Sequence, residues 1–482
     1  MTTTARPPSP VLDPPGPALG HPSPVERGRV RPIWLVLLAT SLPMFMATLD
    51  NLVMTSALPV IRADLGASVE QLQWFVNAYT LAFATFMLPA AALGDRVGRR
   101  RVFAAGVALF TVASVAAALS TTSEALIAAR TVQGLGAAAI LPLSLTLLAA
   151  AVPAARRAVA IGIWGGVSGL GIALGPVVGG AVVTGVSWQA IFWLNVPVAL
   201  LAIPLIVLAL TESTGEHRRV DLLGTALLGG SVFLGIFGLV NGNEDGWDSA
   251  GVIASLVVAA ALLPAYVLHA RRRPDALVPL RLFTHRGFAV ANVVGLTFSL
   301  GVFGAVFLLS QNLQIVMGYT PLEAGVRTLP WTAAPMVVAP IAGALVSRVG
   351  LRVLLVSGLA LQAGALLWMA PLVERTAPYA ELVPAFLMAG VGMGLTFGPS
   401  ATAVLHRLRE ADFATASSAN NTIREFGLAL GIAVLTAVFL ARGGELTPAG
   451  YEGAIGVTLL VGAGSVAVAA VAALFAPDGR DT

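Results

Sequence analysis

Four ionisable residues interrupt long apolar segments of this 482-residue chain, and their side chains could carry chemistry. They are Asp50, Arg130 and the adjacent pair Arg424 and Glu425. A charge at the centre of a bilayer costs about 2.5–3.5 kcal/mol on insertion scales, so each is a functional candidate by default. A carboxylate in such surroundings can load and release a proton as its environment alternates, and a nearby arginine modulates that exchange.

The segments around these residues are those of a membrane protein. Hydrophobic residues make up 57% of the chain and charged residues 11%, whereas soluble domains contain about 45–50% and about 25%. Apolar segments of about 18–25 residues recur along nearly the whole sequence, and each is long enough to cross a hydrocarbon core of about 30 Å as a helix. The predicted fold class is therefore an all-α polytopic membrane protein embedded in the lipid bilayer.

Fourteen transmembrane helices are predicted. Their ranges are 33–59, 71–93, 102–120, 124–151, 158–183, 189–210, 222–241, 250–270, 286–317, 323–346, 351–371, 378–405, 413–441 and 453–475. Arginines cluster at one set of helix ends, and the opposite loops are acidic or neutral, as in "NEDGWD" (243–248). Because arginine favours the cytoplasmic side, we expect a multi-pass protein of the inner (cytoplasmic) membrane with both termini in the cytoplasm.

Residue content argues against other classes of function. The net charge of +4 comes from small arginine clusters at helix ends rather than one basic stripe, so nucleic-acid binding is not expected. There is no cysteine, and the five histidines lie in the tail or near helix ends, so neither a metal site nor an intramembrane hydrolase is expected. All 28 basic residues are arginine, which excludes a lysine-containing phosphate loop. We therefore predict no cofactor and no enzyme.

A short internal repeat suggests two related halves, as in transporters. "LGDRVGRR" (93–100) and "LVSRVGLR" (345–352) share five residues at the same spacing, although such a turn can also recur by chance. Because the copies follow the second and tenth spans, two extra spans lie between the halves. The predicted parts are a disordered Pro-rich cytoplasmic tail (1–32), an N-terminal six-helix bundle (33–212), an inserted two-helix hairpin with linkers (213–275), a C-terminal six-helix bundle (276–475) and a cytoplasmic tail (476–482).

The fifth predicted span contains a glycine pattern, "GIALGPVVGG" (171–180). Glycines four residues apart share one helix face and allow another backbone to approach closely. The proline removes one backbone hydrogen bond and kinks the helix. Ordinary small-residue packing would account for the glycines alone, but the longer pattern is more specific. Its residues are Gly171, Gly175, Pro176, Gly179 and Gly180.

Five segments, in order, resemble motifs of the major facilitator superfamily, in its fourteen-span drug:proton antiporter-2 (multidrug efflux) branch. Two are the turn at 94–100 and the span-five pattern above, which resembles the antiporter motif. The others resemble the motifs of span one, span four and the entry to span six: "LDNLVMTSALP" (49–59), "RTVQGLGAA" (130–138) and "SWQAIFWLNVP" (187–197). The chain departs from the family pattern at Leu52, Thr55, Ala91, Gln189 and Ser347. The resemblance covers 33–475 and implies two six-helix bundles that rock around a central cavity.

The resemblance also implies roles for the intramembrane charges. Spans one and four meet at the cavity in this family, so Asp50 is interpreted as the main proton-coupling carboxylate and Arg130 as the residue that modulates it. A permanent structural ion pair is the alternative. Glu425 is either a second protonation or cation-substrate site, or a structural partner of the turn arginines or of lipid headgroups. Near the external end of span ten, "TPLE" (320–323) predicts a capping box by Thr320 and Glu323, with Arg327 one turn away.

The charged turn is interpreted as a conformational switch. Its residues are Asp95, Arg96, Gly98, Arg99 and Arg100, and Gly98 is expected to accept a positive φ at little cost. By resemblance, Asp95 is expected to face the start of span thirteen, where the helix dipole favours an anion. The arginines would then reach Glu410, Asp412 or Glu425 and close the cytoplasmic side.

The predicted function is proton-coupled export, by alternating access and as a monomer, of amphipathic or lipophilic, mainly cationic, drugs or antibiotics. A dedicated exporter of one metabolite or self-made antibiotic and a nutrient importer are alternatives within transport. A membrane enzyme or sensor is the alternative from another class. Candidate polar groups of the cavity wall, each of which could equally be an interhelical hydrogen bond, are Asn77, Tyr79, Gln133, Gln311, Asn312, Gln314 and Asn420.

Overall fold

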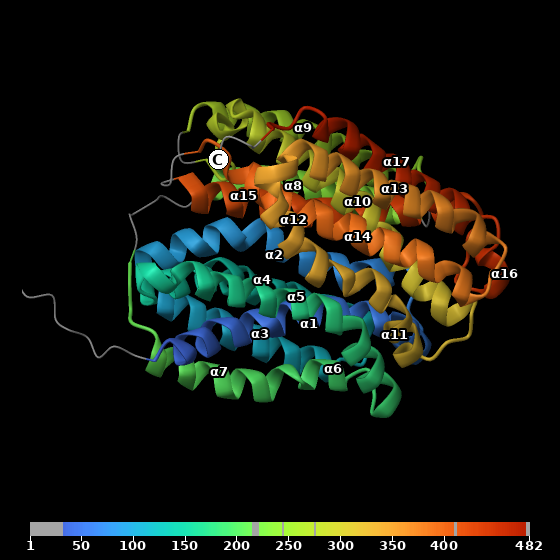
Figure 1. Cartoon of the computed structure of the whole chain (residues 1–482). Coiled ribbons are helices and arrows are strands. Elements are labelled where there is room, and N and C mark those ends of the chain that lie inside the picture. Colours follow the sequence, from blue (N-terminus) through green and yellow to red (C-terminus); the bar gives the residue numbers. More distant parts are fainter. Residues whose placement is uncertain (1–31, 215–220, 243–244, 274–275, 409–411, 479–482) are drawn as a thin grey trace, which may run out of the picture.

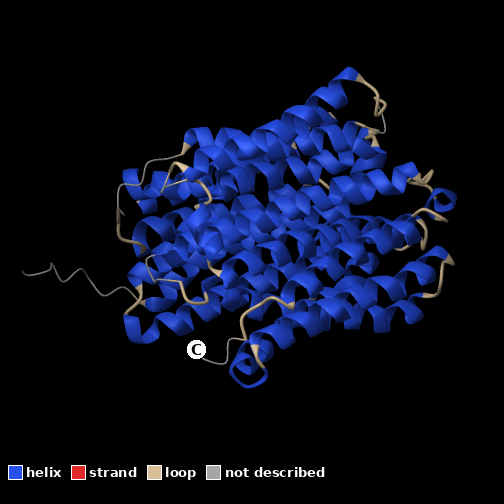
Figure 2. Ribbon diagram, turned by 90° about the horizontal axis from the view of Figure 1, so that it is seen from above, coloured by secondary structure: helices blue, strands red, loops and turns tan. Residues whose placement is uncertain are grey.

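The computed structural model describes residues 32–214, 221–242, 245–273, 276–408 and 412–478. The predicted tail 1–32 lies outside these residues except for Pro32, and so does the end of the tail 476–482. The described chain contains helices and no strands (Figure 2). This is the all-α membrane architecture that the apolar segments predict.

The helices follow the predicted spans closely. In chain order they are α1 (Ile33–Leu65), α2 (Val69–Val97), α3 (Arg99–Ala118), α4 (Ser123–Ala151), α5 (Ala154–Gly185), α6 (Ala190–Trp193), α7 (Asn195–Ala209), α8 (Leu222–Asn241), α9 (Ala250–Arg271), α10 (Arg286–Ile315), α11 (Pro321–Thr332), α12 (Ala334–Val349), α13 (Leu351–Glu374), α14 (Tyr379–Leu405), α15 (Phe413–Ala441), α16 (Pro448–Tyr451) and α17 (Ile455–Ala473), with the 3-10 helix η1 (Leu280–Thr284) before α10. Thirteen segments of the described residues are long and apolar enough to span a membrane, and the 32-residue α5 is a fourteenth of that length.

Two predicted spans are broken helices rather than continuous ones. The span predicted at 189–210 divides into α6 and α7, and the span at 323–346 divides into α11 and α12. Pro197 and Pro335 each lie just after a break, where proline has no N–H to donate to the carbonyl four residues earlier. The last span is also shorter than predicted, because the short helix α16 and the turn after it precede α17.

The helices form two layers that face each other (Figure 1). In the first layer α4 packs on α2 and α3, and α1 packs on α5 and α7. In the second layer α10 packs on α15 and α17, and α13 packs on α14 and α17. The layers meet where α5 packs on α11, where α2 packs on α15, and where α1 packs on α10. This is the arrangement of two six-helix bundles that the sequence predicts.

The inserted helices α8 and α9 pack on each other, and α8 also packs on both bundles. Its residues Ile236 and Val240 lie in one apolar cluster with Leu81 of α2 and Phe426 of α15. The hairpin therefore covers the seam between α2 and α15 along one side of the molecule.

The two ends of the bundle differ in charge. One end, called the arginine-rich face below, carries the start of α1, the end of α17 and the turns that contain Arg99–Arg101, Arg271–Arg273, Arg281 and Arg348 (left in Figure 1). The other end, called the opposite face, carries α6, α11 and α16 (Figure 1). On the opposite face the bundles touch directly, since Arg62 Nη1 donates to the carbonyl of Leu446 across 3.0 Å.

Candidate functional site

Asp50 of α1 and Arg130 of α4 form a buried ion pair in the first bundle. Arg130 Nη1 donates to Asp50 Oδ2 at 2.5 Å, and the two side chains are 0% and 2% exposed. The helices that carry them pack on each other, and α4 also packs closely on α2 through small residues. Gly134, for example, lies so close to Tyr79 that a Cβ would be 2.4 Å from its carbonyl oxygen. The structure thus brings the two predicted residues into direct contact.

Three neutral side chains complete the surroundings of the Asp50 carboxylate. Its Oδ1 accepts hydrogen bonds from Gln133 Nε2 at 2.9 Å and Asn195 Nδ2 at 2.8 Å. Both amides also donate to Ser114 Oγ, at 2.9 and 3.2 Å. Ser114 and Asn195 were not predicted. Ser114 is one of a few hydroxyl residues in its apolar span and carries no stronger signal, and Asn195 lies within the span-six segment that resembles the family motif.

Arg130 is also held by the second helix. Its Nε donates to the carbonyl of Phe75 at 3.0 Å, and its guanidinium lies 4.3 Å from the centre of the Tyr79 ring. The buried Nη2 atom has no hydrogen-bond partner among the described residues. Arg130 therefore joins α1, α2 and α4, while one of its donors remains available.

Glu425 of α15 faces this group from the other bundle. It lies on α15, which packs on α2, the helix whose Tyr79 ring lies against Arg130. Glu425 Oε2 is buried, and no described residue donates a hydrogen bond to it. The predicted partnership with the turn arginines is not seen among the described contacts. The intramembrane charges of both bundles thus lie on the two sides of the α2–α15 seam.

The charged turn between α2 and α3 is held by Glu212, which the sequence did not single out. Gly98 has the predicted positive φ, 123°, and Asp95 Oδ1 accepts from Arg99 Nε at 2.8 Å. Glu212 Oε1 accepts from the backbone N–H of Arg100 at 2.9 Å, and its carboxylate lies 3.8 Å from Arg100 Nε. A Cβ on Gly98 would be 2.8 Å from Glu212 Cδ.

One predicted partner of the turn, Asp412, is paired with another arginine in this conformation. Asp412 makes a bidentate ion pair with Arg281, at 2.7 and 3.1 Å. Glu410 lies outside the described residues. Arg96 lies in the last turn of α2 and forms no ion pair with any described residue. The turn therefore contacts its own bundle, through Glu212, and the predicted contact with the start of α15 stays a prediction.

The glycine pattern of α5 packs against both bundles at the opposite face. A Cβ on Gly175 would be 2.6 Å from Leu52 Cβ, and a Cβ on Gly179 would be 2.8 Å from the Val53 carbonyl oxygen. The contact of Gly171 is less tight, since a Cβ there would be 3.3 Å from its nearest neighbour, Thr48 Cβ. A Cβ on Gly180 would be 2.2 Å from the carbonyl oxygen of Pro321 in α11. The expected close backbone approach is thus present, on α1 and across the seam on α11.

Pro176 extends the same contact. Its carbonyl accepts from Ser56 Oγ of α1 at 3.2 Å. It also lies against Gly325 of α11, where a Cβ would be 2.2 Å from the same oxygen. The bundles are therefore in close contact at the opposite face.

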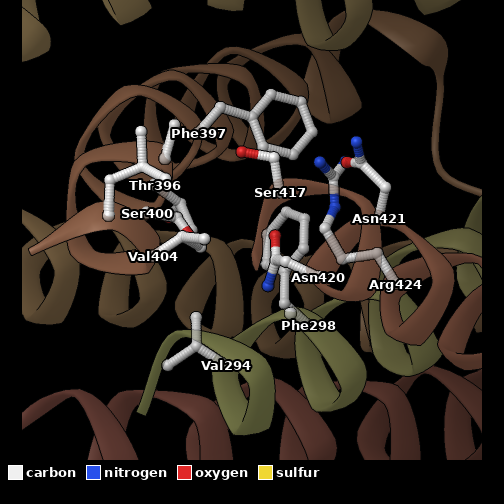
Figure 3. Close-up of a pocket in the computed structure, with 13 residues that line it drawn as sticks. Val294, Phe298, Thr396, Phe397, Ser400, Val404, Ser417, Asn420, Asn421 and Arg424 are labelled. Atoms are coloured by element: carbon white, nitrogen blue, oxygen red, sulfur yellow. The ribbon is translucent and has the colours of Figure 1, made fainter. Parts of the chain in front are cut away.

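The seven polar residues predicted for the cavity wall occupy different places in the described structure. Asn420 borders a pocket between α10, α14 and α15 in the half of the bundle nearer the arginine-rich face (Figure 3). Gln133 belongs to the Asp50 network, and Gln314 Nε2 donates to the carbonyl of Ser56 at 3.2 Å, near the opposite face. Tyr79 Oη donates to the carbonyl of Ala47 at 3.2 Å. The other three are buried between helices, namely Asn77, Gln311 and Asn312.

The capping box of α11 is present as predicted. Thr320 Oγ1 accepts from the N–H of Glu323 at 3.3 Å, and Glu323 Oε2 accepts from the N–H of Thr320 at 2.9 Å. Arg327 contacts Glu323 through the backbone carbonyl, and its guanidinium lies 3.8 Å from the Tyr319 ring centre. Glu323 is therefore explained by helix capping.

The comparisons with known proteins agree with this geometry. Residues 40–432 match the family model described as "Major Facilitator Superfamily". The multidrug resistance protein Stp of Mycobacterium tuberculosis is 36% identical over 409 residues, which are 84% of this chain and 76% of that protein. The tetracenomycin C resistance and export protein of Streptomyces glaucescens is 33% identical over 88% of this chain and 79% of its own length.

Solved structures of transporters share the fold. The xylose transporter XylE from E. coli superimposes with a TM-score of 0.63 over 91% of this chain and 96% of that one, at 13% identity. PepTSo, a POT family transporter, superimposes with a TM-score of 0.68 over 92% of this chain and 97% of its own chain, also at 13% identity. On the family model, the relatives and the fold, the chain belongs to the Major Facilitator Superfamily and is a membrane transporter rather than an enzyme.

Proposed function

We propose that this transporter is a proton-coupled antiporter that exports amphipathic or lipophilic drugs or antibiotics across the cytoplasmic membrane. The buried pair of Asp50 and Arg130 is the observation that carries the proposal. Asp50 accepts hydrogen bonds from three side chains on two other helices, α4 and α7. Protonation of the carboxylate would weaken the ion pair and loosen the contact between these helices. A proton would thereby change the packing of the first bundle.

The proton gradient supplies enough free energy for export. A membrane potential contributes about 2.3 kcal/mol per charge per 100 mV, so one proton at about 150 mV contributes around 3.5 kcal/mol. Each 1.4 kcal/mol corresponds to about a tenfold concentration ratio, so one proton sustains a substrate gradient of a few hundredfold.

The charge asymmetry of the bundle supports the orientation. Arginine favours the cytoplasmic side, so the arginine-rich face, with both termini, is assigned to the cytoplasm. In this assignment the contacts of α5 with α11 close the external side. The proposed units are the bundles 33–212 and 276–475 and the inserted hairpin 213–275, working as a monomer. Asp95, Arg99 and Arg100 would lie at the cytoplasmic gate, next to Glu212 in the conformation seen here.

A dedicated exporter of one self-made antibiotic is a second candidate. It is favoured by relatives whose names specify a single compound, such as the tetracenomycin C resistance and export protein and the cephamycin export protein of Amycolatopsis lactamdurans. The two candidates differ in substrate range alone, and the same proton chemistry serves both.

Dye efflux in an efflux-deficient bacterial host tests the proposal. Cells that express the chain should extrude structurally unrelated lipophilic and cationic dyes, and a protonophore should abolish the extrusion. Extrusion that persists with protonophore would contradict proton coupling. Extrusion of one compound class from a broad panel would favour the dedicated exporter, and uptake of the panel in place of extrusion would contradict export.

A further inference from the structure

The pocket that Asn420 borders contains a partly exposed cation, Arg424, which forms no ion pair with any described carboxylate. It lies between α10, α14 and α15, in the half of the second bundle nearer the arginine-rich face (Figure 3). Arg424 extends into it from α15, on the third helical turn from the start of that helix. Its position in a membrane-spanning helix makes an uncompensated charge costly. Such a cost points to a ligand.

The surroundings of Arg424 do not neutralise it. Among the described residues, no carboxylate forms an ion pair with it and no acceptor receives a hydrogen bond from it. The neighbouring Glu425 contributes at longer range. The close contact of the guanidinium is the ring of Phe397, whose centre lies 4.9 Å away. Arg130, in contrast, has a carboxylate partner at 2.5 Å.

The pocket offers further donors and aromatic walls. Ser417 and Asn421 of α15 line it, are partly exposed, and make no side-chain hydrogen bond with described residues. Phe298 and Phe397 form the apolar side, edge to face, with ring centres 5.7 Å apart. Figure 3 shows the Phe397 ring and the Arg424 guanidinium turned toward each other. A guanidinium, an amide and a hydroxyl beside two aromatic rings match an anionic group attached to an aromatic ring.

The size of the pocket sets which part of a substrate it takes. Its volume is about 180 Å³, whereas sites for drug-sized ligands enclose roughly 300–1,000 Å³. It therefore accommodates one end of such a molecule, and the rest would extend toward the seam between the bundles.

We propose that Arg424 is the centre of an anion-binding subsite that holds the carboxylate, sulfonate or ionised phenol of an aromatic substrate. This inference rests on the proposed function and adds aromatic anions to its substrate class, whereas a cationic drug would bind away from Arg424. Arg424, Asn421 and Ser417 supply the donors, and Phe298 and Phe397 hold the ring.

Two dyes with the same skeleton test the subsite. 1-Anilinonaphthalene-8-sulfonate carries a sulfonate, and N-phenyl-1-naphthylamine lacks it. Binding of both is measured by fluorescence with the purified full chain in lipid nanodiscs, corrected with protein-free nanodiscs. Arg424→Gln should weaken sulfonate binding about tenfold or more and leave the neutral dye within about twofold, since hydrogen bonds to charged groups contribute about 1.5–3 kcal/mol. Arg424→Lys should retain most of the preference for the sulfonate.

Arg442→Gln is the matched control, because Arg442 is an exposed residue at the other end of α15. It should leave both affinities unchanged. Equal weakening of both dyes by Arg424→Gln would show a packing role and overturn the subsite, as would unchanged sulfonate binding. If Arg424→Gln does not fold, competition with the wild type decides: 1-naphthoate should displace the sulfonate dye, and 1-naphthylmethanol, its uncharged counterpart, should not.

The same probes separate this proposal from the proposed function. One outcome is protonophore-sensitive efflux of the neutral dye together with sulfonate binding that does not depend on Arg424. This outcome would support the exporter and contradict the subsite. Arg424-dependent sulfonate binding without efflux of either dye would leave the subsite and remove the exporter.

Discussion

Gly180 of α5 and Pro321 of α11 join the two bundles at the opposite face with no room for a side chain. A Cβ on Gly180 would lie 2.2 Å from the Pro321 carbonyl oxygen, well inside van der Waals contact. The neighbouring contact of Gly325 with the Pro176 carbonyl repeats this relationship from the other helix. The glycine pattern of α5 is therefore a contact surface between bundles, and the contact must separate when that face opens.

Gly180→Ala should force the opposite face open. Overpacking costs about 1–3 kcal/mol, which shifts the population of the open state about tenfold. Because the chain has no cysteine, a single Ser310→Cys at the seam reports the change through labelling by a membrane-impermeant maleimide. Labelling should be faster in the Gly180→Ala background. Gly185→Ala is the control, since nothing lies within 4 Å of a Cβ there, and equal rates in both would contradict the role of Gly180.

Asp50→Asn should abolish proton-driven efflux in vesicles. It should also destabilise the protein, because removal of one partner of a buried ion pair costs about 3–5 kcal/mol. The double variant Asp50→Asn/Arg130→Gln separates the two effects, since it removes both charges of the pair and leaves neither partner unpaired. The double variant should regain much of the lost thermal stability and still fail to transport. Glu445→Gln, an exposed carboxylate, is the control for neutralisation. Restored transport in the double variant would support a purely structural ion pair.

Asp95→Asn should reduce transport severalfold without reducing the amount of protein in the membrane. The substitution removes the negative charge that pairs with Arg99 at 2.8 Å and that the family resemblance assigns to closing the cytoplasmic gate. Efflux rates normalised to membrane-inserted protein check this. Asp248→Asn, in an exposed loop of the opposite face, should have no effect. If Asp95→Asn transports at the wild-type rate, the turn does not act in gating and its arginines serve only to orient the protein in the membrane.

The start of the inserted hairpin should be sensitive to acid. Burial acts to raise the pKa of Asp221, but hydrogen bonds from the N–H groups of Gly224 and Leu277 and from His269 outweigh it and hold the pKa below its ordinary value. A lowered pKa in the folded state means that the stabilisation is fully present above the ordinary value of about 3.9 and is lost as the pH falls through the folded value.

Thermal unfolding between pH 7 and pH 3 checks this prediction. The wild type should lose more stability over the acid end of this range than Asp221→Ala, which lacks the cap at every pH. Parallel acid profiles of the two proteins would show that Asp221 does not contribute through its charge.

Features that depend on local composition and spacing can be predicted from the amino-acid sequence. Apolar length alone places the helices, because a bilayer requires about 20 residues per span. The capping box of Thr320 and Glu323 and the positive φ of Gly98 follow from neighbours within a few residues. Asp50 and Arg130 stood out because charge in an apolar segment is costly wherever the helix packs.

The groups that surround these residues come from distant parts of the chain and become evident in the folded structure. Asn195 donates to Asp50 from 145 positions away, and Glu212 accepts from Arg100 from 112 positions away. Neutral polar side chains carry no cost large enough to mark them in the sequence, and the rotation of each helix about its axis is set by packing with its neighbours. Arg424 shows the same limit, since its charge was evident from the sequence, whereas its open pocket depends on how α10, α14 and α15 come together.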